Sequence, residues 1–373
     1  MSMAELNYTE LRDWVALSMA KGLGPRGIKK LAEQFGSASS ILDTPVKFLE
    51  SSGMCSPKQA SALNDTADLR LRADQEIKKL KRLGARPLVC GYAPYPALLS
   101  EVADPPPVLY AQGRVEELDN EAVALVGSRS ATSYGKKAAF RLAQELGGTG
   151  MSVVSGLAAG IDAQAHLGCM NSGGLTVGVL GCGLDVVYPR INKEIYQRMS
   201  REGIVLSEYP LGTKPDGFRF PARNRIIAGL CLGVVVVEAA KRSGSLITVQ
   251  FALDEGREVC AVPGQVDSAK SMGTHWLIKQ GATLVTSAED VRSCLGLEGG
   301  TRSNERKMDQ PSVEKLDSDA RRLYQLLEEY PMSRQELVQE TGFPIALLNQ
   351  CLLVLELEGF VEMVPGDMVR CIS

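Results

Sequence analysis

The central part of the chain alternates short apolar runs with amphipathic segments. The runs are AVALVG (122–127), MSVVSG (151–156), LTVGVLG (175–181), GIVLSEY (203–209), LGVVVVEA (232–239), EVCAVPG (258–264) and ATLVTS (282–287). Strands that are apolar without alternation are buried on both faces, and strands that alternate with helices form parallel sheets covered on both sides. The pattern therefore predicts an α/β domain built on a doubly wound parallel sheet.

The segments on either side of this domain have different patterns. Residues 1–85 carry apolar positions at helical spacing, for example in LRDWVALSMA and RGIKKLAEQF. The proline-rich stretch 89–113 predicts an extended connector with short strands, and the polar stretch 297–316 predicts a flexible linker. Residues 317–373 predict three helices and a hairpin, the order of a winged helix. We expect four parts: helical 1–85, α/β 86–296, linker 297–316 and winged helix 317–373.

Composition indicates a soluble globular protein. The 373 residues are 45% hydrophobic and 23% charged. No run approaches the roughly 18 apolar residues of a membrane span, and the first residues lack the pattern of a signal peptide, so we expect a cytoplasmic protein. Nine cysteines without a CxxC pair, with only two histidines, argue against zinc, and we expect neither metal nor cofactor.

The net charge of −3 is unevenly distributed. Residues 317–373 hold ten acids against four bases, so the rest of the chain is mildly basic. The third predicted helix of this segment, 345–359, contains Glu356 and Glu358 and no lysine or arginine. Contact with phosphates normally requires cations, so we expect this winged helix to contact protein or to regulate the chain itself rather than to bind DNA.

The predicted strands end in loops rich in glycine, hydroxyl, amide and cationic side chains. The carboxyl ends of parallel strands meet at one edge of the sheet, where free N–H groups of helix starts favour anions. The sequence therefore predicts phosphate binding by residues of these loops: Gly127, Ser128, Arg129, Ser155, Gly156, Arg190, Asn192, Lys193, Ser243, Gly244 and Ser245. No complete GxGxxG or GxxxxGK[ST] motif supports a dinucleotide or a P-loop site.

The segment FRFPARNRIIAGL (218–230) places aromatic rings beside Arg223, Asn224 and Arg225. We expect the arginines to face phosphates and Phe218 or Phe220 to stack on an unpaired base. A duplex hides its base faces, so this mixture favours single strands. In the alternative arrangement, the rings pack in the core and the arginines pair with acids.

Three further features each allow two interpretations. Asp162 and His166, four residues apart on a helix, form either an acid–base pair or a hydrogen-bonded pair that orients a loop. Gly22 and Gly24, followed by Lys29 and Lys30, form either a phosphate contact of a SAM or helix-hairpin-helix element or a plain helix junction. His275 precedes WLIKQG and is interpreted as a helix-start residue rather than a ligand.

Several motifs between about residues 90 and 290 together resemble the DprA/Smf DNA-processing family of bacteria: VGSRSATSYG, SGLAAGIDAQAH, GCGLDVVYPRIN, FPARNRIIAGL, VVVEAAKRSGSLIT and AVPG. The resemblance implies an extended Rossmann-like domain that binds single-stranded DNA, forms a homodimer and loads RecA during natural transformation, with no established catalysis. By motif, it assigns DNA binding to Gly127–Arg129, Arg190–Lys193, Phe220 and Arg223–Arg225. One departure is His275, where the family usually has asparagine.

An enzyme is the alternative function. Rossmann-like phosphoribohydrolases cleave nucleotide monophosphates at a similar edge with a glycine-rich loop and a glutamate. Glu238 at the end of VVVVE could supply that glutamate, but the PGGxGT loop expected of such enzymes is missing.

Overall fold

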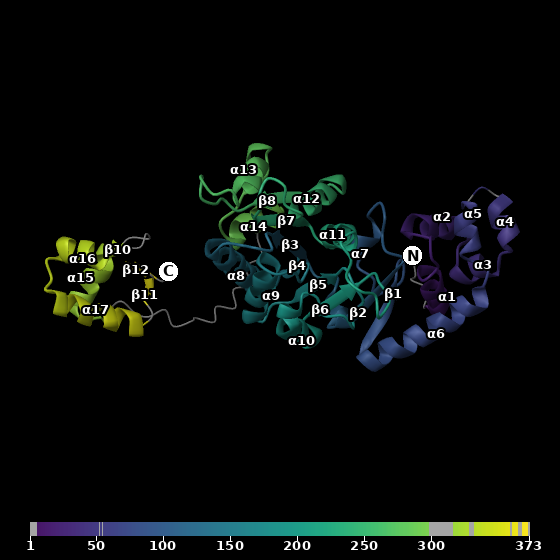
Figure 1. The fold of residues 1–373 in the computed structure, drawn as a ribbon, viewed down its shortest axis with the longest axis horizontal. Helices are drawn as coiled ribbons and strands as arrows, with labels where there is room; N and C mark the ends of the chain where they lie inside the picture. Colours follow the sequence, from purple (N-terminus) through teal and green to yellow (C-terminus); the bar gives the residue numbers. More distant parts are fainter. Residues whose placement is uncertain are drawn as a thin grey trace. The chain divides into compact units, whose positions relative to one another are not determined.

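The computed structural model describes residues 6–51, 53, 55–297, 316–327, 332–358, 360–364 and 368–371. The chain divides into two compact units, Met1–Arg302 and Ser303–Ser373 (Figure 1). Most of the predicted linker 297–316 lies outside the described residues. The finer boundaries expected at residues 85, 296 and 316 stay predictions.

The first unit is built on a nine-stranded sheet with the order β1-β2-β6-β5-β4-β3-β7-β8-β9. Every apolar run of the sequence became one of the parallel strands, which confirms the predicted sheet. These strands are β3 (Ala122–Gly127), β4 (Ser152–Ser155), β5 (Thr176–Leu180), β6 (Ile204–Ser207), β7 (Gly233–Glu238), β8 (Glu258–Ala261) and β9 (Thr283–Leu284).

Residues 85–113 add two strands, and one of them, β2, lies in the proline-rich connector for which the sequence predicted short strands. β1 (Ala85–Val89) pairs antiparallel with β2 (Val108–Gly113), and β2 pairs antiparallel with β6. The sheet is therefore mixed, with a large parallel part and an antiparallel edge.

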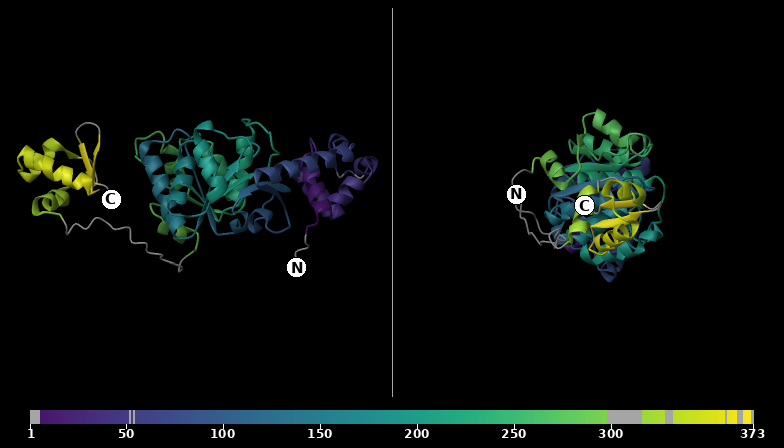
Figure 2. Two further views of the ribbon diagram at one scale, coloured as in Figure 1. Left: turned by 90° about the horizontal axis from the view of Figure 1, so that it is seen from below. Right: turned by 90° about the vertical axis from the view of Figure 1, so that its left-hand side faces the viewer.

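Helices cover both faces of the sheet (Figure 2). On β3, Val123 and Leu125 share a core with α8 (Ser133–Gly148), α9 (Ile161–Asn171) and α14 (Ala288–Cys294). The intervening residues Ala124 and Val126 belong to the opposite core, with α7 (Ala97–Ser100), α11 (Arg219–Gly229), α12 (Ser245–Asp254) and α13 (Met272–Lys279). Neighbouring residues of one strand thus enter different cores, which confirms burial on both faces.

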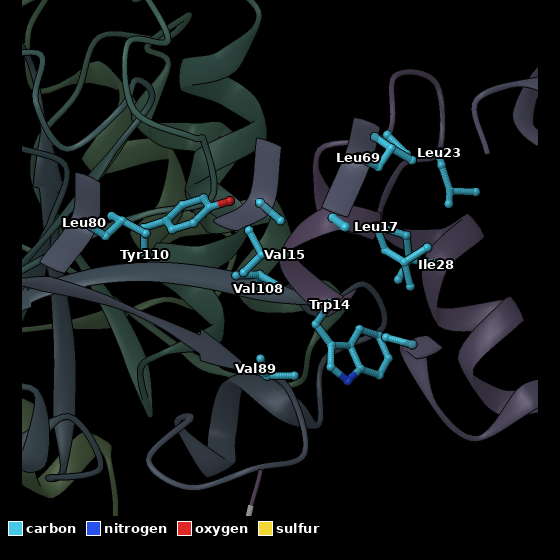
Figure 3. Packing of buried hydrophobic residues seen from close by; sticks show 14 of the residues in the cluster. Trp14, Val15, Leu17, Leu23, Ile28, Leu69, Leu80, Val89, Val108 and Tyr110 are labelled. Atoms are coloured by element: carbon cyan, nitrogen blue, oxygen red, sulfur yellow. The ribbon is translucent and has the colours of Figure 1, made fainter. Parts of the chain in front are cut away.

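The N-terminal helices share their core with the antiparallel edge of the sheet. They are α1 (Tyr8–Ser18), α2 (Pro25–Phe35), α3 (Ala38–Asp43), α4 (Val46–Ser51), α5 (Pro57–Ser61) and α6 (Thr66–Leu83). Figure 3 shows Trp14 and Val15 of α1 close to Val89, Val108 and Tyr110 of the two edge strands. α10 (Lys193–Glu202) adds Tyr196 and Met199 to the same cluster.

Two cations of α2 contact the connector between β1 and β2. Lys29 donates to the Ala103 carbonyl at 3.0 Å, and Arg26 pairs with Asp104. Lys29 therefore serves a packing contact, which favours the helix-junction interpretation of the Gly22–Gly24 turn.

The second unit contains α15 (Ser318–Leu326), α16 (Arg334–Thr341), α17 (Ile345–Leu357) and the strands β11 (Val361–Val364) and β12 (Met368–Cys371). This order confirms the predicted winged helix. A short strand that the sequence did not predict, β10 (Met332–Ser333), pairs with β12. Among the described helices none alone is long and apolar enough to span a membrane, although α16 and α17, bent by 111°, meet that test of length and composition together.

Candidate nucleic-acid interface

An open pocket of about 470 Å³ lies at the carboxyl edge of the parallel strands. It is formed by the loops after β3 and β7, the start of α9 and one side of α11, next to the central strand β3, which has β4 on one side and β7 on the other. Crevices at such a reversal of strand order are the usual ligand sites of open α/β sheets. The predicted residues that line it are Gly127, Ser128, Arg129, Phe220, Arg223, Asn224, Ser243, Gly244 and Ser245.

The position of the loop after β3 depends on a glycine. A Cβ atom on Gly127 would lie 2.6 Å from Cγ1 of Ile161 and 2.8 Å from the Glu238 carbonyl oxygen. The backbone N–H of Ser128 donates to that same carbonyl at 2.8 Å. This close approach of β3 to β7 brings Ser128 and Arg129 to the pocket.

A guanidinium and an aromatic ring of the pocket lining continue into a second aromatic ring just outside the lining. The exposed Arg129 has its guanidinium carbon 5.2 Å from the centre of the Phe220 ring, and the Phe220 ring lies 5.3 Å from the ring of Tyr188. Tyr188 is 40% exposed, so this row of planar groups is open to a flat partner. Tyr188 directly precedes Pro189 and Arg190 in the loop after β5, but it was not among the predicted site residues.

Arg223 lies beneath the pocket and is only 4% exposed. Its Nη1 donates to the carbonyl oxygens of Gly156, at 2.6 Å, and Val179. A side chain at Gly156 would force the Arg223 guanidinium to move, because its Cβ would lie 2.1 Å from Nη1. Burial lowers the pKa of the Arg223 guanidinium to about 10. The nearby Asp162 carboxylate acts in the opposite direction and raises this pKa.

Asp162 supports the loop after β4 from below. Its carboxylate accepts from the backbone N–H groups of Gly156, at 3.1 Å, and Ala158, at 3.3 Å. Burial raises the pKa of Asp162, while the charge of Arg223 and these two hydrogen bonds act in the opposite direction. Asp162 lines the pocket, and its Oδ2 atom accepts both hydrogen bonds from the loop.

Arg225 is also held by internal acceptors. Its guanidinium pairs with Glu208 and donates to the Asp104 carbonyl at 2.8 Å. The outward orientation that the sequence suggested for Arg223 and Arg225 is therefore replaced by internal contacts. Of the described arginines that line the pocket, Arg129 is the exposed one.

The remaining predicted residues lie outside the pocket. Ser155 is buried and donates to the Leu125 carbonyl at 2.6 Å. Asn192 is buried and donates to the carbonyls of Leu157, at 2.9 Å, and Ala158, at 3.0 Å, so it holds the loop after β4 in place. Arg190 and Lys193 are exposed and lie outside the pocket lining. Phe218 also lies outside the lining and is 65% exposed.

Asp162 and His166 do not form the expected pair: no hydrogen bond joins their side chains among the described residues. Nδ1 of His166 lies 2.7 Å from the Thr176 hydroxyl, and burial lowers the pKa of His166 to about 3, which keeps the ring neutral. Of these two residues, Asp162 alone orients the loop after β4, and His166 takes no part in that contact. His275, in α13, contacts the Gly264 carbonyl through Nε2 at 3.0 Å.

Glu238 has a structural partner at the start of α8. Its buried carboxylate accepts from the backbone N–H of Thr132 at 3.2 Å and from the Thr132 hydroxyl. It is not among the residues that line the pocket. In the described part of the chain, no three histidine, cysteine or acidic side chains gather as metal ligands.

Comparison with known proteins gives concordant results. The family model of DNA recombination-mediator protein A matches residues 87–296, and that of the DprA winged helix domain matches residues 307–367. Protein Smf of Synechocystis is 33% identical, over 95% of this chain and 96% of its own length. The X-ray structure of DNA processing protein A from Streptococcus pneumoniae is 36% identical with a TM-score of 0.67, and the match covers 76% of this chain and 97% of that one.

A further solved structure concerns single-stranded DNA directly. It describes the single-stranded DNA binding mode of DNA processing protein A from Helicobacter pylori. That protein is 30% identical with a TM-score of 0.52, over 57% of this chain and 95% of its own.

Proposed function

Because the chain belongs to the DNA recombination-mediator protein A family of DNA-processing proteins, we propose that its carboxyl-edge pocket binds single-stranded DNA without sequence preference. The observation that carries this proposal is that Arg129 and Phe220 line one open pocket, while Tyr188, outside its lining, packs against the Phe220 ring. Sites for single strands combine cations, which track the phosphates, with rings on which bases stack.

Other features of the pocket suit a phosphate chain. The first turn of α12, with Gly244 as its N-cap and no side-chain cap, lines the pocket with Ser243 and Ser245. Backbone N–H groups at a helix start favour anions. The H. pylori relative, whose solved structure concerns single-stranded DNA, supports the same ligand for this chain.

The alternative function of a nucleotide-cleaving enzyme is less well supported. The glutamate that it requires, Glu238, is bound to Thr132 and lies outside the pocket lining. Release of free base from AMP by the purified chain would revive this alternative.

Substitutions at the pocket mouth test the proposal. Phe220→Ala should weaken binding of oligo-dT by about 5- to 150-fold, the equivalent of about 1–3 kcal/mol for one lost base stack. Arg129→Glu should weaken it further, because a repulsive charge replaces an exposed cation, and should also lower the salt dependence of binding by about 0.7 in log–log slope per lost contact. Arg201→Glu, an exposed residue of α10 outside the pocket, is the matched control.

Binding is measured by gel shift or fluorescence anisotropy at stated salt, and folding by circular dichroism. Wild-type affinity of Arg129→Glu would refute the site. Equal losses in Arg129→Glu and Arg201→Glu would show that overall charge, rather than the pocket, governs binding.

We further propose, from the family resemblance, that the cytoplasmic chain forms a homodimer through its α/β domain and loads RecA on the bound strand. One feature supports the dimer: α13 and the edge strand β9 expose Met272, Trp276 and Leu284, each 49% accessible. Light scattering of Leu284→Glu tests this assembly, and an unchanged dimer would exclude that edge. Failure of the purified chain to accelerate RecA assembly on single-stranded DNA that the chain has already bound would exclude the loading role.

A further inference from the structure

A second cationic surface lies far from the pocket in the fold. Between Glu76 and Glu101 the chain has five lysines and arginines and no acid. Four of these side chains occupy the last two turns of α6, the fifth lies on β1, and Arg114 follows β2. We call these six exposed residues the basic patch: Lys78, Lys79, Lys81, Arg82, Arg86 and Arg114.

The topology places the basic patch at the amino edge of the sheet. The end of β2, Gly113, pairs with Ile204 at the start of the parallel strand β6. The start of β1, directly after α6, pairs with the same end of β2 (Figure 1). The pocket lies at the carboxyl ends of the parallel strands, so the two surfaces occupy opposite edges of the sheet.

An open hollow of about 360 Å³ lies within the basic patch. It is lined by Lys81, Arg86 and Arg114, by backbone at Gly84 and Gly113, and by one acid, Glu116. No aromatic residue lines it. The hollow therefore offers cations without a surface for base stacking.

Acids neutralise only part of the basic patch. Arg86 pairs with Glu116 at 2.6 Å, and Arg114 pairs with Glu117 at 2.6 Å. Both pairs are exposed and therefore weak. Within the described part of the chain, no salt bridge within 4.0 Å involves the four cations of α6, although the charge of Lys79 acts on the buried carboxylate of Glu76, so a net positive charge remains.

Helix stability explains only part of this clustering. Cations in the last turn interact favourably with the helix dipole, by about 0.3–1 kcal/mol each. However, Lys78 with Lys81 and Arg82 are like charges three and four residues apart, which oppose helix formation by about 0.2–0.5 kcal/mol per pair. A ligand of opposite charge would relieve this repulsion.

We propose that the basic patch binds the phosphate backbone of duplex DNA. A helix rises about 1.5 Å per residue, so Lys78 to Arg82 span about 6 Å, whereas duplex DNA presents a charge about every 1.7 Å along its axis. Backbone contact by cations alone suits a duplex, whose base faces are hidden, whereas single-strand sites add aromatic rings. One chain would thus hold a single strand and a duplex at opposite edges of one sheet.

The test compares two full-length variants that lose the same charge. The patch variant is Lys78→Gln, Lys79→Gln, Lys81→Gln, Arg82→Gln. The control variant is Lys21→Gln, Lys47→Gln, Lys58→Gln, Lys279→Gln, all exposed and outside the basic patch. The patch variant should bind a blunt-ended duplex at least about tenfold more weakly than the control, and its log–log salt slope should fall by about 3–4, since each lost duplex contact contributes about 0.9.

Two further measurements separate this proposal from the single-strand pocket. The patch variant should bind short oligo-dT as the control variant does, and Arg129→Glu should keep its duplex affinity. Equal duplex binding by the patch and control variants would overturn the proposal, as would a loss of oligo-dT binding as large as the loss of duplex binding. If Arg129→Glu bound oligo-dT normally, the pocket proposal would fail, while the duplex comparison would still decide the basic patch.

Discussion

Replacing Arg223 with methionine should destabilise the first unit strongly. The guanidinium is 4% exposed and serves the carbonyls of Gly156 and Val179, with the Asp162 carboxylate nearby. Removing one member of a buried charge network typically costs about 3–5 kcal/mol, because the remaining polar groups stay buried without a partner. Methionine also recovers part of this loss, since burial of the guanidinium is itself unfavourable, as its lowered pKa indicates. We expect a net loss of about 3 kcal/mol.

Tryptophan fluorescence in a denaturant titration measures this loss for the first unit alone. The chain has two tryptophans, Trp14 and Trp276, and both lie in that unit. The neighbouring Asn224→Ala is the control: its Nδ2 lies 3.5 Å from the Gly244 carbonyl, a weak contact, so its loss should stay below about 1 kcal/mol. Arg129→Glu should leave the midpoint near that of the wild type, because Arg129 is exposed.

The combination of stability and binding decides the role of Arg223. Arg223→Met should lower the denaturation midpoint, and its loss of oligo-dT binding should follow from the disturbed loop after β4. If Arg223→Met unfolds at the wild-type midpoint but no longer binds oligo-dT, the guanidinium contacts DNA and the internal role is wrong.

Two other predictions concern stability. Burial lowers the pKa of His166 to about 3 in the folded chain, against 6.5 in the unfolded chain, so acidification protonates the unfolded chain first. Between pH 6.5 and 4.5 this histidine should therefore lower the free energy of unfolding of the wild type by about 2–3 kcal/mol. His166→Gln should lose clearly less over that range, as denaturant titrations at each pH will measure. In α8, a Cβ on Gly135 would lie 2.6 Å from Oε2 of Glu238, whereas one on Gly148 would meet open space. Gly135→Ala should therefore destabilise by about 1–3 kcal/mol and Gly148→Ala stabilise by about 0.4–1 kcal/mol; the same sign for both in thermal unfolding would contradict this packing.

The strands of the parallel sheet could be predicted because burial on both faces leaves a local signature. Runs such as AVALVG need no knowledge of their neighbours to be identified as buried strands. The pairing of β1 with β2 and of β2 with β6 has no such signature. The direction of β2 against β6 depends on contacts with residues more than ninety positions away, for example Tyr110 with Ser207. Proline in the connector indicates only the absence of a long helix.

The position of the site could be predicted, but not the orientation of its side chains. Topology brings the loops after β3 and β7 to one edge, so Arg129 and Ser243 meet at the pocket as the strand pattern indicates. Arg223 was expected to face phosphates, but it lies three and four residues before the buried Ile226 and Ile227 and so belongs to the buried face of α11. The partner of Arg225, Glu208, lies before α11 and could not be identified from the local pattern.

The two edges of a doubly wound sheet attract anions for different reasons. At the carboxyl edge, the positive ends of the helix dipoles favour phosphate, and at the proposed site the exposed guanidinium of Arg129 adds a full charge near the start of α12. At the amino edge the helices end, and their carbonyl groups carry partial negative charge that repels phosphate. Any phosphate contact there must come from side chains alone. The run of cations without acids after Glu76 is therefore evidence for an anionic ligand. The same cations at a helix start would be weaker evidence, because the helix itself favours anions there.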